Sequence, residues 1–307
     1  MTTHLEAIDR RRSRSWLGTL QRLTQPWTRH ALISPQDSSL PGEGGTPDVS
    51  SLEIITRTPD ERKPLIEHWK NMPAQVVAYS GGTYPDGTRY GEGRRLLIGQ
   101  EQVMDSFEEP WCRATIDKVF QEKRQGPLVV VERGFGLGIM SQLILEQMLS
   151  RGGVYNIIEL NNTVYKWARE WASRANEHIK PLGINLTIQV LQGDADEIIE
   201  QTQEAQFIDI LISDTYPLVE DELGINDLLG LSAMTSRLKD EGVFTFFASH
   251  KDNQGGGLDE KQLRLTYNHF RRFTVETTEV IPPSDCTYLQ GPKKKLPVVL
   301  CELPRRA

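Results

Sequence analysis

Glu132-Arg133-Gly134-Phe135-Gly136-Leu137-Gly138-Ile139 is the stretch that decides the fold of this chain. It follows a short β-branched run, Leu128 to Glu132, and precedes a helical pattern from Ile139 to Arg151. Glycines at alternate positions let the backbone approach a ligand closely, and the N–H groups at the start of a helix are free to contact it. The stretch therefore predicts a nucleotide-like cofactor at a strand–turn–helix junction.

The glycine spacing distinguishes between two kinds of cofactor. Dinucleotide sites carry Gly-x-Gly-x-x-Gly, whereas the glycines here are Gly134, Gly136 and Gly138, and position 139 is Ile. Glu132, directly before the turn, would repel a pyrophosphate but is placed to hold the methionyl end of a ligand. A nucleoside site is therefore expected rather than a pyrophosphate site.

Short β-branched runs alternate with longer helical periods from residue 126 onward, which is typical of successive βα units. The last two expected strands are joined by the polar stretch Pro282 to Pro297, which is too short for a crossover helix, so we expect them to pair antiparallel. The pattern predicts an α/β, Rossmann-like fold with a mostly parallel seven-stranded sheet, an antiparallel last strand and an N-terminal extension. The expected strands are 128–132, 154–159, 186–191, 207–213, 243–248, 273–280 and 298–303, and the expected helices are 101–121, 139–151, 163–179, 221–238 and 258–270.

Three regions are expected along the chain. Residues 1–52 form an arm and a flexible linker, because the stretch from Ser34 to Ser51 is rich in Pro, Gly and Ser. Residues 53–125 form a helical segment that covers the active site, and residues 126–307 form the cofactor-binding catalytic domain.

Composition excludes several classes of function. The chain has 307 residues, a formal charge of −7 and 38% apolar residues, and its apolar runs are strand-sized. The negative charge argues against nucleic acid and favours a small cationic partner, and no span predicts a membrane segment. Three scattered cysteines, without metal-ligand spacing, favour a reducing cytoplasm and no metal.

Acidic residues stand at the carboxyl ends of the expected strands, where open α/β sheets bind their ligands. Glu159 is placed to accept the ribose hydroxyls, and Gly193-Asp194 lies where adenine is expected. Asp214 ends the fourth strand. Upstream, Glu108 lies in an acidic and aromatic segment, and if that segment covers the pocket, Glu108 and Asp214 form a two-carboxylate clamp.

These residues resemble the family of guanidinoacetate N-methyltransferase and its relatives that methylate arginine nitrogens, within the class I S-adenosylmethionine-dependent methyltransferases. The resemblance covers the span from Arg94 to Leu303. Its matching blocks are Val103-Met104 through Glu108 and Pro110-Trp111, Gly134-Phe135-Gly136 onward, Ile157 to Asn161, Asp214-Thr215-Tyr216-Pro217-Leu218, and Pro282-Pro283-Ser284-Asp285-Cys286-Thr287-Tyr288.

The resemblance implies a role for each matching position. Glu108 and Asp214 would be catalytic and would grip a guanidinium, with Tyr216 beside them, and Met104 would lie near the transferred methyl. The backbone around Ser249-His250 would receive a substrate carboxylate, but these two residues replace the Leu-Thr of the family, which puts guanidinoacetate itself in doubt. The S-adenosylmethionine site would comprise Met104, Glu132, Gly134, Phe135, Gly136, Leu137, Gly138, Ile139, Glu159, Leu160, Asn161, Gly193, Asp194 and Asp214.

Paired carboxylates suit methylation of a guanidino nitrogen. A guanidinium has a pKa above about 12, so an enzyme must localise its charge and withdraw a proton as the methyl arrives. The sequence favours a small substrate, free L-arginine or a guanidinoacetate-like metabolite. Arginine in a protein, a non-catalytic S-adenosylmethionine-binding or scaffolding module, and a nicotinamide-dependent oxidoreductase stay open as alternatives, as does a homodimer.

Overall fold

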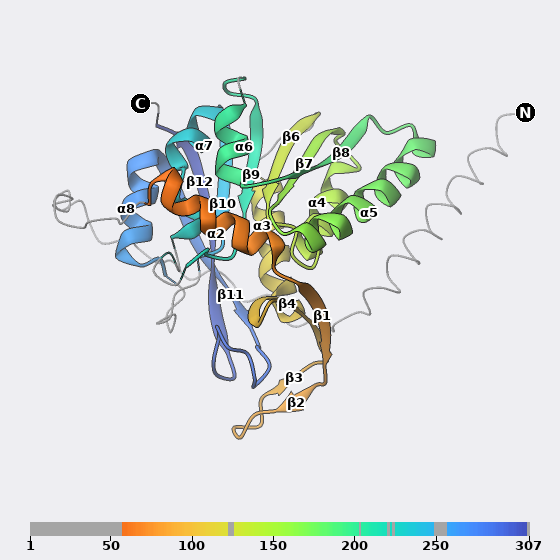
Figure 1. Cartoon of the computed structure of the whole chain (residues 1–307), viewed down its shortest axis with the longest axis vertical. Helices are drawn as coiled ribbons and strands as arrows, with labels where there is room; N and C mark the ends of the chain where they lie inside the picture. The colour runs from red at the N-terminus through yellow and green to blue at the C-terminus, as the bar shows by residue number, and fades with distance from the viewer. Residues whose placement is uncertain are drawn as a thin grey trace, which may run out of the picture. The chain divides into compact units, whose positions relative to one another are not determined.

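The computed structural model describes residues 57–121, 126–202, 204–219, 222, 225–248 and 257–305 (Figure 1). All of these residues belong to one compact unit. The expected arm and linker over residues 1–52 lie outside the described residues, and the boundaries at 52 and 125 stay predictions. In the described part of the chain, no helix combines the length and the apolar composition that crossing a membrane requires.

Seven strands form the central sheet in the order β11-β12-β10-β9-β6-β7-β8. Strands β6 to β10 run parallel to their neighbours within that group, whereas β12 is antiparallel to both β10 and β11. The expected Rossmann-like sheet with an antiparallel last strand is therefore confirmed. The strands are β6 (Leu128–Arg133), β7 (Gly153–Glu159), β8 (Leu186–Gln192), β9 (Ile208–Ser213), β10 (Leu238–Phe246), β11 (Phe270–Val280) and β12 (Lys294–Pro304).

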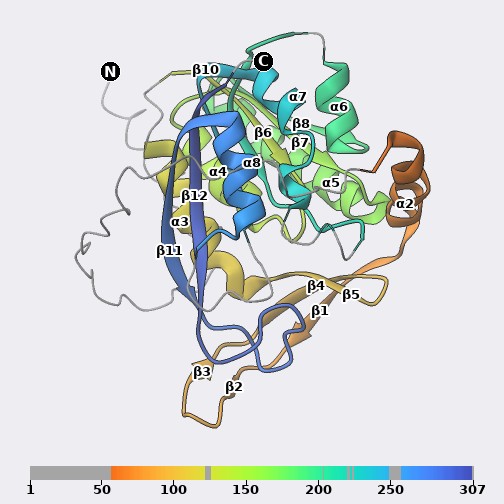
Figure 2. The same cartoon turned by 90° about the vertical axis from the view of Figure 1, so that its left-hand side faces the viewer.

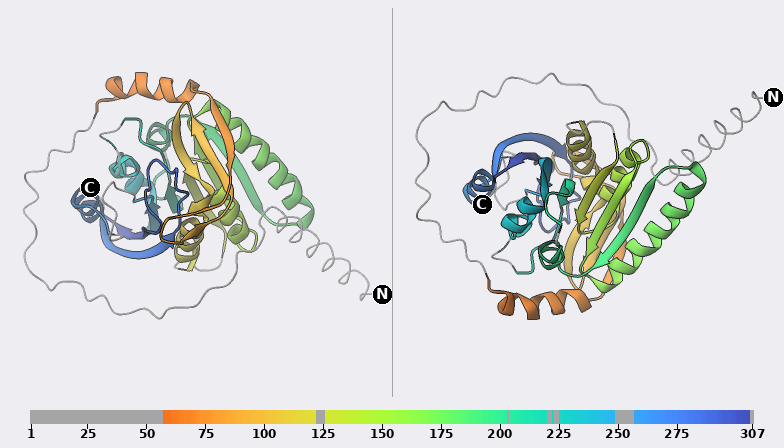
Figure 3. Two further views of the ribbon diagram at one scale, coloured as in Figure 1. Left: turned by 90° about the horizontal axis from the view of Figure 1, so that it is seen from below. Right: turned by 90° about the horizontal axis from the view of Figure 1, so that it is seen from above.

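Helices cover both faces of this sheet, because successive strand residues point to opposite sides. Val130 and Ile157 pack in the core with α3 (Glu109–Gln121), α4 (Ile139–Met148) and α5 (Asn162–Ile179). Their neighbours Val131 and Ile158 pack in the other core, which includes residues of α6 (Ala195–Gln201), α7 (Leu231–Arg237) and α8 (Glu260–His269). In Figure 3, α5 in green and α8 in blue lie on opposite sides of the molecule.

The segment before the central sheet forms a second, smaller sheet. Strands β1 (Ala74–Tyr79), β4 (Gly93–Ile98) and β5 (Glu101–Asp105) pair antiparallel, and β2 (Gly82–Thr83) pairs with β3 (Arg89–Tyr90). Figure 2 shows these strands beside the loop between β11 and β12. Tyr84 Oη donates to the Pro282 carbonyl at 2.9 Å, which ties the β2–β3 hairpin to that loop. The helix α2 (Pro59–Asn71) precedes β1, and Thr58 caps it.

Two expected helices are corrected by the structure. The helix expected over 101–121 begins only at Glu109, because Glu101–Asp105 pairs with β4 and Ser106–Glu108 forms the 3₁₀ turn η1. The helix expected over 221–238 is reduced to the short turn η4 (Asn226–Leu228) and α7, since Gly230 takes a left-handed conformation with φ of 74° between them. The short helices α2 and α6 were not expected, and η2 (Lys180–Leu182) only extends α5.

Candidate active site

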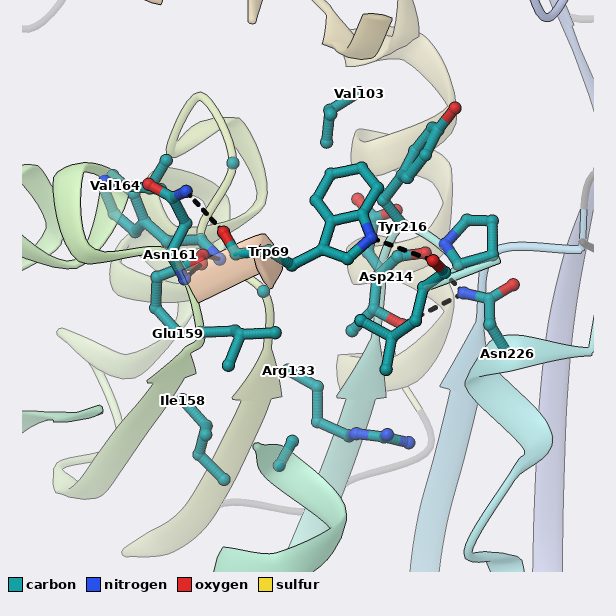
Figure 4. Close-up of a pocket in the computed structure, with 18 of the residues that line it drawn as sticks. Trp69, Val103, Arg133, Ile158, Glu159, Asn161, Val164, Asp214, Tyr216 and Asn226 are labelled. Carbon is teal, nitrogen blue, oxygen red and sulfur yellow. Dashed lines mark hydrogen bonds between the residues drawn. The ribbon is translucent and has the colours of Figure 1, made fainter. Parts of the chain in front are cut away.

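A pocket opens at the carboxyl ends of β6, β7 and β9. The chain order of the sheet reverses between β6 and β9, and open α/β sheets bind ligands at such a switch point. The pocket is lined from the strand ends, from β5 and η1, and from α2. Figure 4 shows Trp69 of α2 lying across the strand ends, with Glu159 on one side and Asp214 on the other.

The glycine turn after β6 requires glycine for two separate reasons. Gly134 and Gly136 have φ of 86° and 53°, which side-chain-bearing residues rarely adopt. A Cβ atom at Gly134 would lie 2.4 Å from the backbone oxygen of Asp214, and one at Gly136 would lie 2.5 Å from the Met104 sulfur. The turn therefore brings the backbone into close contact with both Asp214 and Met104.

Glu159 ends β7 beside the same turn and is buried. Its Oε2 accepts from the Phe135 backbone N–H at 2.9 Å and its Oε1 from the Asn161 N–H at 2.8 Å. Burial raises the pKa of Glu159, and these backbone donors oppose the rise. A carboxylate has about four acceptor sites, so Glu159 retains capacity for ligand hydroxyls.

Glu132 is fully buried beneath the turn. Its Oε2 accepts from Ser141 Oγ at 2.6 Å and from Tyr155 Oη. Its Oε1 has no hydrogen-bond partner among the described residues. Burial raises the pKa of Glu132 to about 8. A buried, unpartnered carboxyl oxygen at the pocket wall suits a ligand that brings a donor or a positive charge.

Glu108 is brought to the pocket by η1 and is only 2% exposed. Its Oε1 accepts from the Asp105 backbone N–H at 2.8 Å and from Tyr288 Oη. Burial, and then the charge of Asp214, raise the pKa of Glu108. Both expected clamp residues, Glu108 and Asp214, therefore line one pocket, and the charge of Asp214 acts on Glu108.

Asp214 follows β9 and is half-buried in the pocket wall. Its backbone N–H donates to the Arg133 carbonyl at 3.1 Å, which continues the β6–β9 pairing by one residue. Burial, and then the charge of Asp227, raise the pKa of Asp214. A cation bound between Glu108 and Asp214 would favour the ionised form of both groups and so lower both pKa values.

Ionisation of Glu108 opposes folding. A carboxyl group whose pKa is higher in the folded than in the unfolded chain holds its proton more tightly when folded, so stability falls as pH rises above its ordinary value of 4.5. We expect Glu108→Gln to raise the thermal midpoint of the free protein by about 3 °C near neutral pH, and by less at about pH 5. Scanning calorimetry measures both midpoints.

The neighbouring Glu109→Gln is the matched control, because the Glu109 carboxylate pairs with Arg113 at the surface. It should leave the midpoint within about 1 °C. A Glu108→Gln midpoint below that of the unaltered protein near neutral pH would contradict a raised pKa of Glu108.

The helix α2 covers the pocket. Trp69 Nε1 donates to the Leu218 carbonyl at 2.9 Å, and the Trp69 ring lies 5.2 Å from that of Tyr216. The first turn of α2 is held as well, because Arg62 pairs with Asp194 and Asp196 at 3.6 Å. Two side chains of α2 that were not predicted as site residues, Arg62 and Trp69, therefore line the pocket.

The structure brings most of the expected site residues together. Ser249 and His250 lie outside the described residues. Leu137, Gly138 and Ile139 do not line the pocket, although the Leu137 N–H donates to the Met104 sulfur at 3.3 Å. The expected residues that line it are Met104, Glu108, Glu132, Gly134, Phe135, Gly136, Glu159, Leu160, Asn161, Gly193, Asp194, Asp214 and Tyr216.

The pocket residues that were not predicted as site residues include Arg62, Trp69, Glu222 and Tyr288. Tyr288 belongs to the Pro-Pro-x-Asp-Cys block, so a signal for it was present. Arg62 and Trp69 have none, because only the folded position of α2 brings them to the pocket.

The pocket fits a nucleoside that carries an amino-acid tail. The glycine turn, Glu159 and Glu132 all line it, and Glu132 Oε1 has no hydrogen-bond partner among the described residues. Within the described part of the chain, no three His, Cys, Asp or Glu side chains are placed to hold a metal ion.

Two solved structures are similar to this chain. A spermidine synthase in complex with the transition-state analogue AdoDATO is similar at 13% identity and a TM-score of 0.50, over 73% of this chain and 73% of that one. A precorrin-6y C5,15-methyltransferase from Geobacter metallireducens GS-15 has 15% identity and a TM-score of 0.43, over 64% of this chain and 86% of that one. The first of these likenesses shows the fold alone.

The family of the chain follows from its sequence. The sequence model of the guanidinoacetate N-methyltransferase family matches residues 90–302, which is more than half of the chain. This range contains the glycine turn, Glu108, Asp214 and Tyr288. The chain therefore belongs to the guanidinoacetate N-methyltransferase family, among the S-adenosylmethionine-dependent methyltransferases.

Proposed function

We propose that this protein methylates a nitrogen of a guanidino group in a small molecule, either free L-arginine or a guanidinoacetate-like metabolite. The observation that carries the proposal is the convergence of Glu108 and Asp214 in one buried pocket next to the glycine turn. Two acidic side chains that line one pocket form a site for a planar cation. Glu108 lies on η1 and Asp214 follows β9, so only the folded chain brings both side chains to one pocket.

The two carboxylates would first orient the substrate. A guanidinium presents its N–H donors in a rigid fork, and a carboxylate accepts two of them in parallel. Tyr288 and the Asp105 N–H hold Glu108 in place, and the close backbone contact with Gly134 fixes Asp214. The substrate nitrogen is thereby aligned without a rearrangement of the pocket.

The same carboxylates would also take up the proton. S-adenosylmethionine, when bound, supplies an electrophilic methyl group on a positively charged sulfur. The new N–C bond forms as the S–C bond breaks, and one guanidino proton passes to Glu108 or Asp214. Their raised pKa values suit proton acceptance near neutral pH.

The cover formed by α2 supports a small substrate over arginine in a protein. Trp69 lies across the strand ends and bonds Leu218, and its ring packs on Tyr216. An arginine on a folded protein needs an open groove beside the two carboxylates. A free metabolite fits beneath such a cover.

Labelled S-adenosylmethionine tests the proposal. The protein is incubated with L-arginine, guanidinoacetate, agmatine and an arginine-containing peptide, and products are identified by mass spectrometry. We expect label in a free guanidino compound and none in the peptide. Label in the peptide alone favours protein arginine methylation, and no label with intact S-adenosylhomocysteine binding favours a non-catalytic module.

Binding of S-adenosylhomocysteine is expected to release a proton from Glu132. The pKa of Glu132 in the free protein is about 8, so its carboxyl group is largely protonated at neutral pH. The ammonium group of the ligand, placed beside it, lowers that pKa and displaces about one proton. Calorimetry at neutral pH in two buffers of different ionisation enthalpy measures the release.

Glu132→Gln should abolish most of this release. The exposed Glu146→Gln on the neighbouring helix α4 is the matched control and should release as many protons as the unaltered protein. Equal release from Glu132→Gln and the control would show that Glu132 does not hold the ammonium group.

A further inference from the structure

Asp227 is a buried carboxylate next to the pocket with no role in the scheme above. It lies on η4 and is 2% exposed. It does not line the pocket, so it makes no contact with a substrate there. A charged group in such a place must be held by several donors, because burial without them is costly.

The donors that hold Asp227 flank Asp214 on both sides. Ser213 Oγ donates to Asp227 Oδ1 at 2.7 Å, and Ser213 directly precedes Asp214. Thr215 directly follows it and donates to the same oxygen twice, from its N–H at 3.0 Å and from Oγ1 at 2.6 Å. One carboxyl oxygen therefore fixes the residues before and after Asp214.

A second contact tightens the same loop. Asn226 Nδ2 donates to the Thr215 carbonyl at 2.6 Å, and Figure 4 shows this bond below Asp214. The short turn η4 thus contacts Thr215 through two neighbouring side chains. These contacts from η4 add to those that Gly134 and Arg133 make with Asp214.

Asp227 also carries charge toward Asp214. Arg133 Nη1 donates to the Asp227 carbonyl at 3.3 Å. Burial raises the pKa of Asp227, and the Arg133 charge and the three hydrogen bonds oppose that rise. Its Oδ2 has no partner among the described residues. This negative charge in turn raises the pKa of Asp214.

We propose that Asp227 is a positioning residue for methyl transfer, which fixes Ser213 and Thr215 around Asp214 and keeps a second negative charge beside it. The proposal rests on the role of Asp214 in the proposed function. It adds a group, outside the pocket, on which the alignment and the proton uptake of Asp214 both depend. It predicts that two variants of Asp227 separate the effect of its charge on Asp214 from the effect of its hydrogen bonds on the position of Asp214.

Several other groups interact with the Asp214 charge and have to be kept constant. They are Glu108 from η1, Cys112 from α3 and Glu132 from β6. Burial raises the pKa of the Cys112 thiol well above its ordinary value, so it is neutral near pH 7. Glu108 and Glu132 are unaltered in every variant below, so a change in Asp214 titration reports on Asp227.

Asp227→Asn removes the charge and keeps an oxygen for Ser213 and Thr215. The Asp214 titration is followed by carbon NMR of the aspartate carboxyl groups in the full chain, with Asp214→Asn used for assignment. We expect the midpoint of Asp214 to fall by about one pH unit, because loss of a like charge favours the ionised form. The acid limb of kcat/KM should move by the same amount, with kcat within about fivefold.

Asp227→Ala removes both the charge and the acceptor. We expect kcat to fall roughly 100-fold while S-adenosylhomocysteine affinity stays within about threefold, because a small displacement of Asp214 misaligns the reacting atoms. The kcat of Asp227→Asn should therefore lie between that of Asp227→Ala and that of the unaltered protein. Asp209→Asn is the control, since it removes another buried carboxylate from β9 that pairs with Lys239 instead.

The outcomes separate this proposal from the proposed function. An unchanged Asp214 midpoint in Asp227→Asn overturns it. A lowered midpoint in a protein that methylates none of the guanidino compounds supports the positioning of Asp214 and refutes the proposed function. Should Asp227→Asn fail to fold, Ser213→Ala tests the geometry alone. We expect kcat to fall about tenfold and the acid limb of kcat/KM to stay unshifted. An unchanged kcat overturns the proposal.

Discussion

Asp214→Asn is expected to abolish methyl transfer while S-adenosylhomocysteine affinity stays within about tenfold. The amide keeps the size of the side chain but presents N–H donors toward a substrate that brings donors itself. It also removes one of the two groups that take up the guanidino proton. The predicted cofactor contacts include the glycine turn and Glu159, and the substitution leaves the Phe135 N–H bond to Glu159 in place.

Single-turnover rates with labelled S-adenosylmethionine and calorimetry of S-adenosylhomocysteine measure the two quantities separately. Asp117→Asn is the control, since Asp117 is exposed on α3. Near-normal turnover in Asp214→Asn would rule out its assigned role. A parallel loss of cofactor affinity would instead assign Asp214 to cofactor binding.

Gly134→Ala should be the most disruptive small substitution in the pocket. Its Cβ would lie 2.4 Å from the Asp214 backbone oxygen, and neither partner is a flexible side chain end. Relief of the collision requires the glycine turn or the Asp214 loop to move. We expect a loss of about 3 kcal/mol of stability and at least a roughly 100-fold weaker affinity for S-adenosylhomocysteine.

Gly87→Ala provides a matched control for this effect. Gly87 has φ of 87°, against 86° at Gly134, but a Cβ atom there meets nothing within 4 Å. Both variants carry the same backbone strain, so the difference between them isolates the collision. Denaturant melts and calorimetry of ligand binding measure it, and equal losses in the two variants would assign the effect to strain alone.

The central sheet was predictable from local pattern. The apolar runs of β6, β7 and β9 are bounded by glycine or polar turns, and their residues are buried on both faces, as in a parallel sheet covered by helices. The polar connection between β11 and β12 left antiparallel pairing as the simple solution, and every residue of β11 except Arg271 pairs with a residue of β12. Only the strand ends differ, by one to five residues.

The N-terminal part was not predictable in the same way. Glu101–Asp105 has no strong strand pattern, and its conformation depends on pairing with β4, where Leu96 lies opposite Met104. The bulge between Leu96 and Leu97 in that pairing depends on tertiary contacts as well. Such contacts override local propensity, and a single sequence does not contain them explicitly.

The site residues also fall into those that a local motif predicts and those that only tertiary contacts bring to the site. Glu108, Asp214 and the glycine turn stand in recognisable motifs, so their convergence was expected before the fold was known. Asp227 and Trp69 act through contacts with distant backbone, to Thr215 and Leu218 respectively, and no spacing in the sequence indicates such a contact. Motifs revealed the groups that face ligands but not the groups that support them.

Asn161 joins two parts of the molecule through one side chain. Its Oδ1 accepts from the N–H groups of Thr163 and Val164 and so starts α5, while its Nδ2 donates to the carbonyls of Trp69 and Met72 at 2.9 Å. The end of α2 is therefore fastened to the edge of the sheet where the ribose is expected. Protease cleavage near residue 72 should then slow when S-adenosylhomocysteine is added, which makes limited digestion a direct gauge of cofactor occupancy.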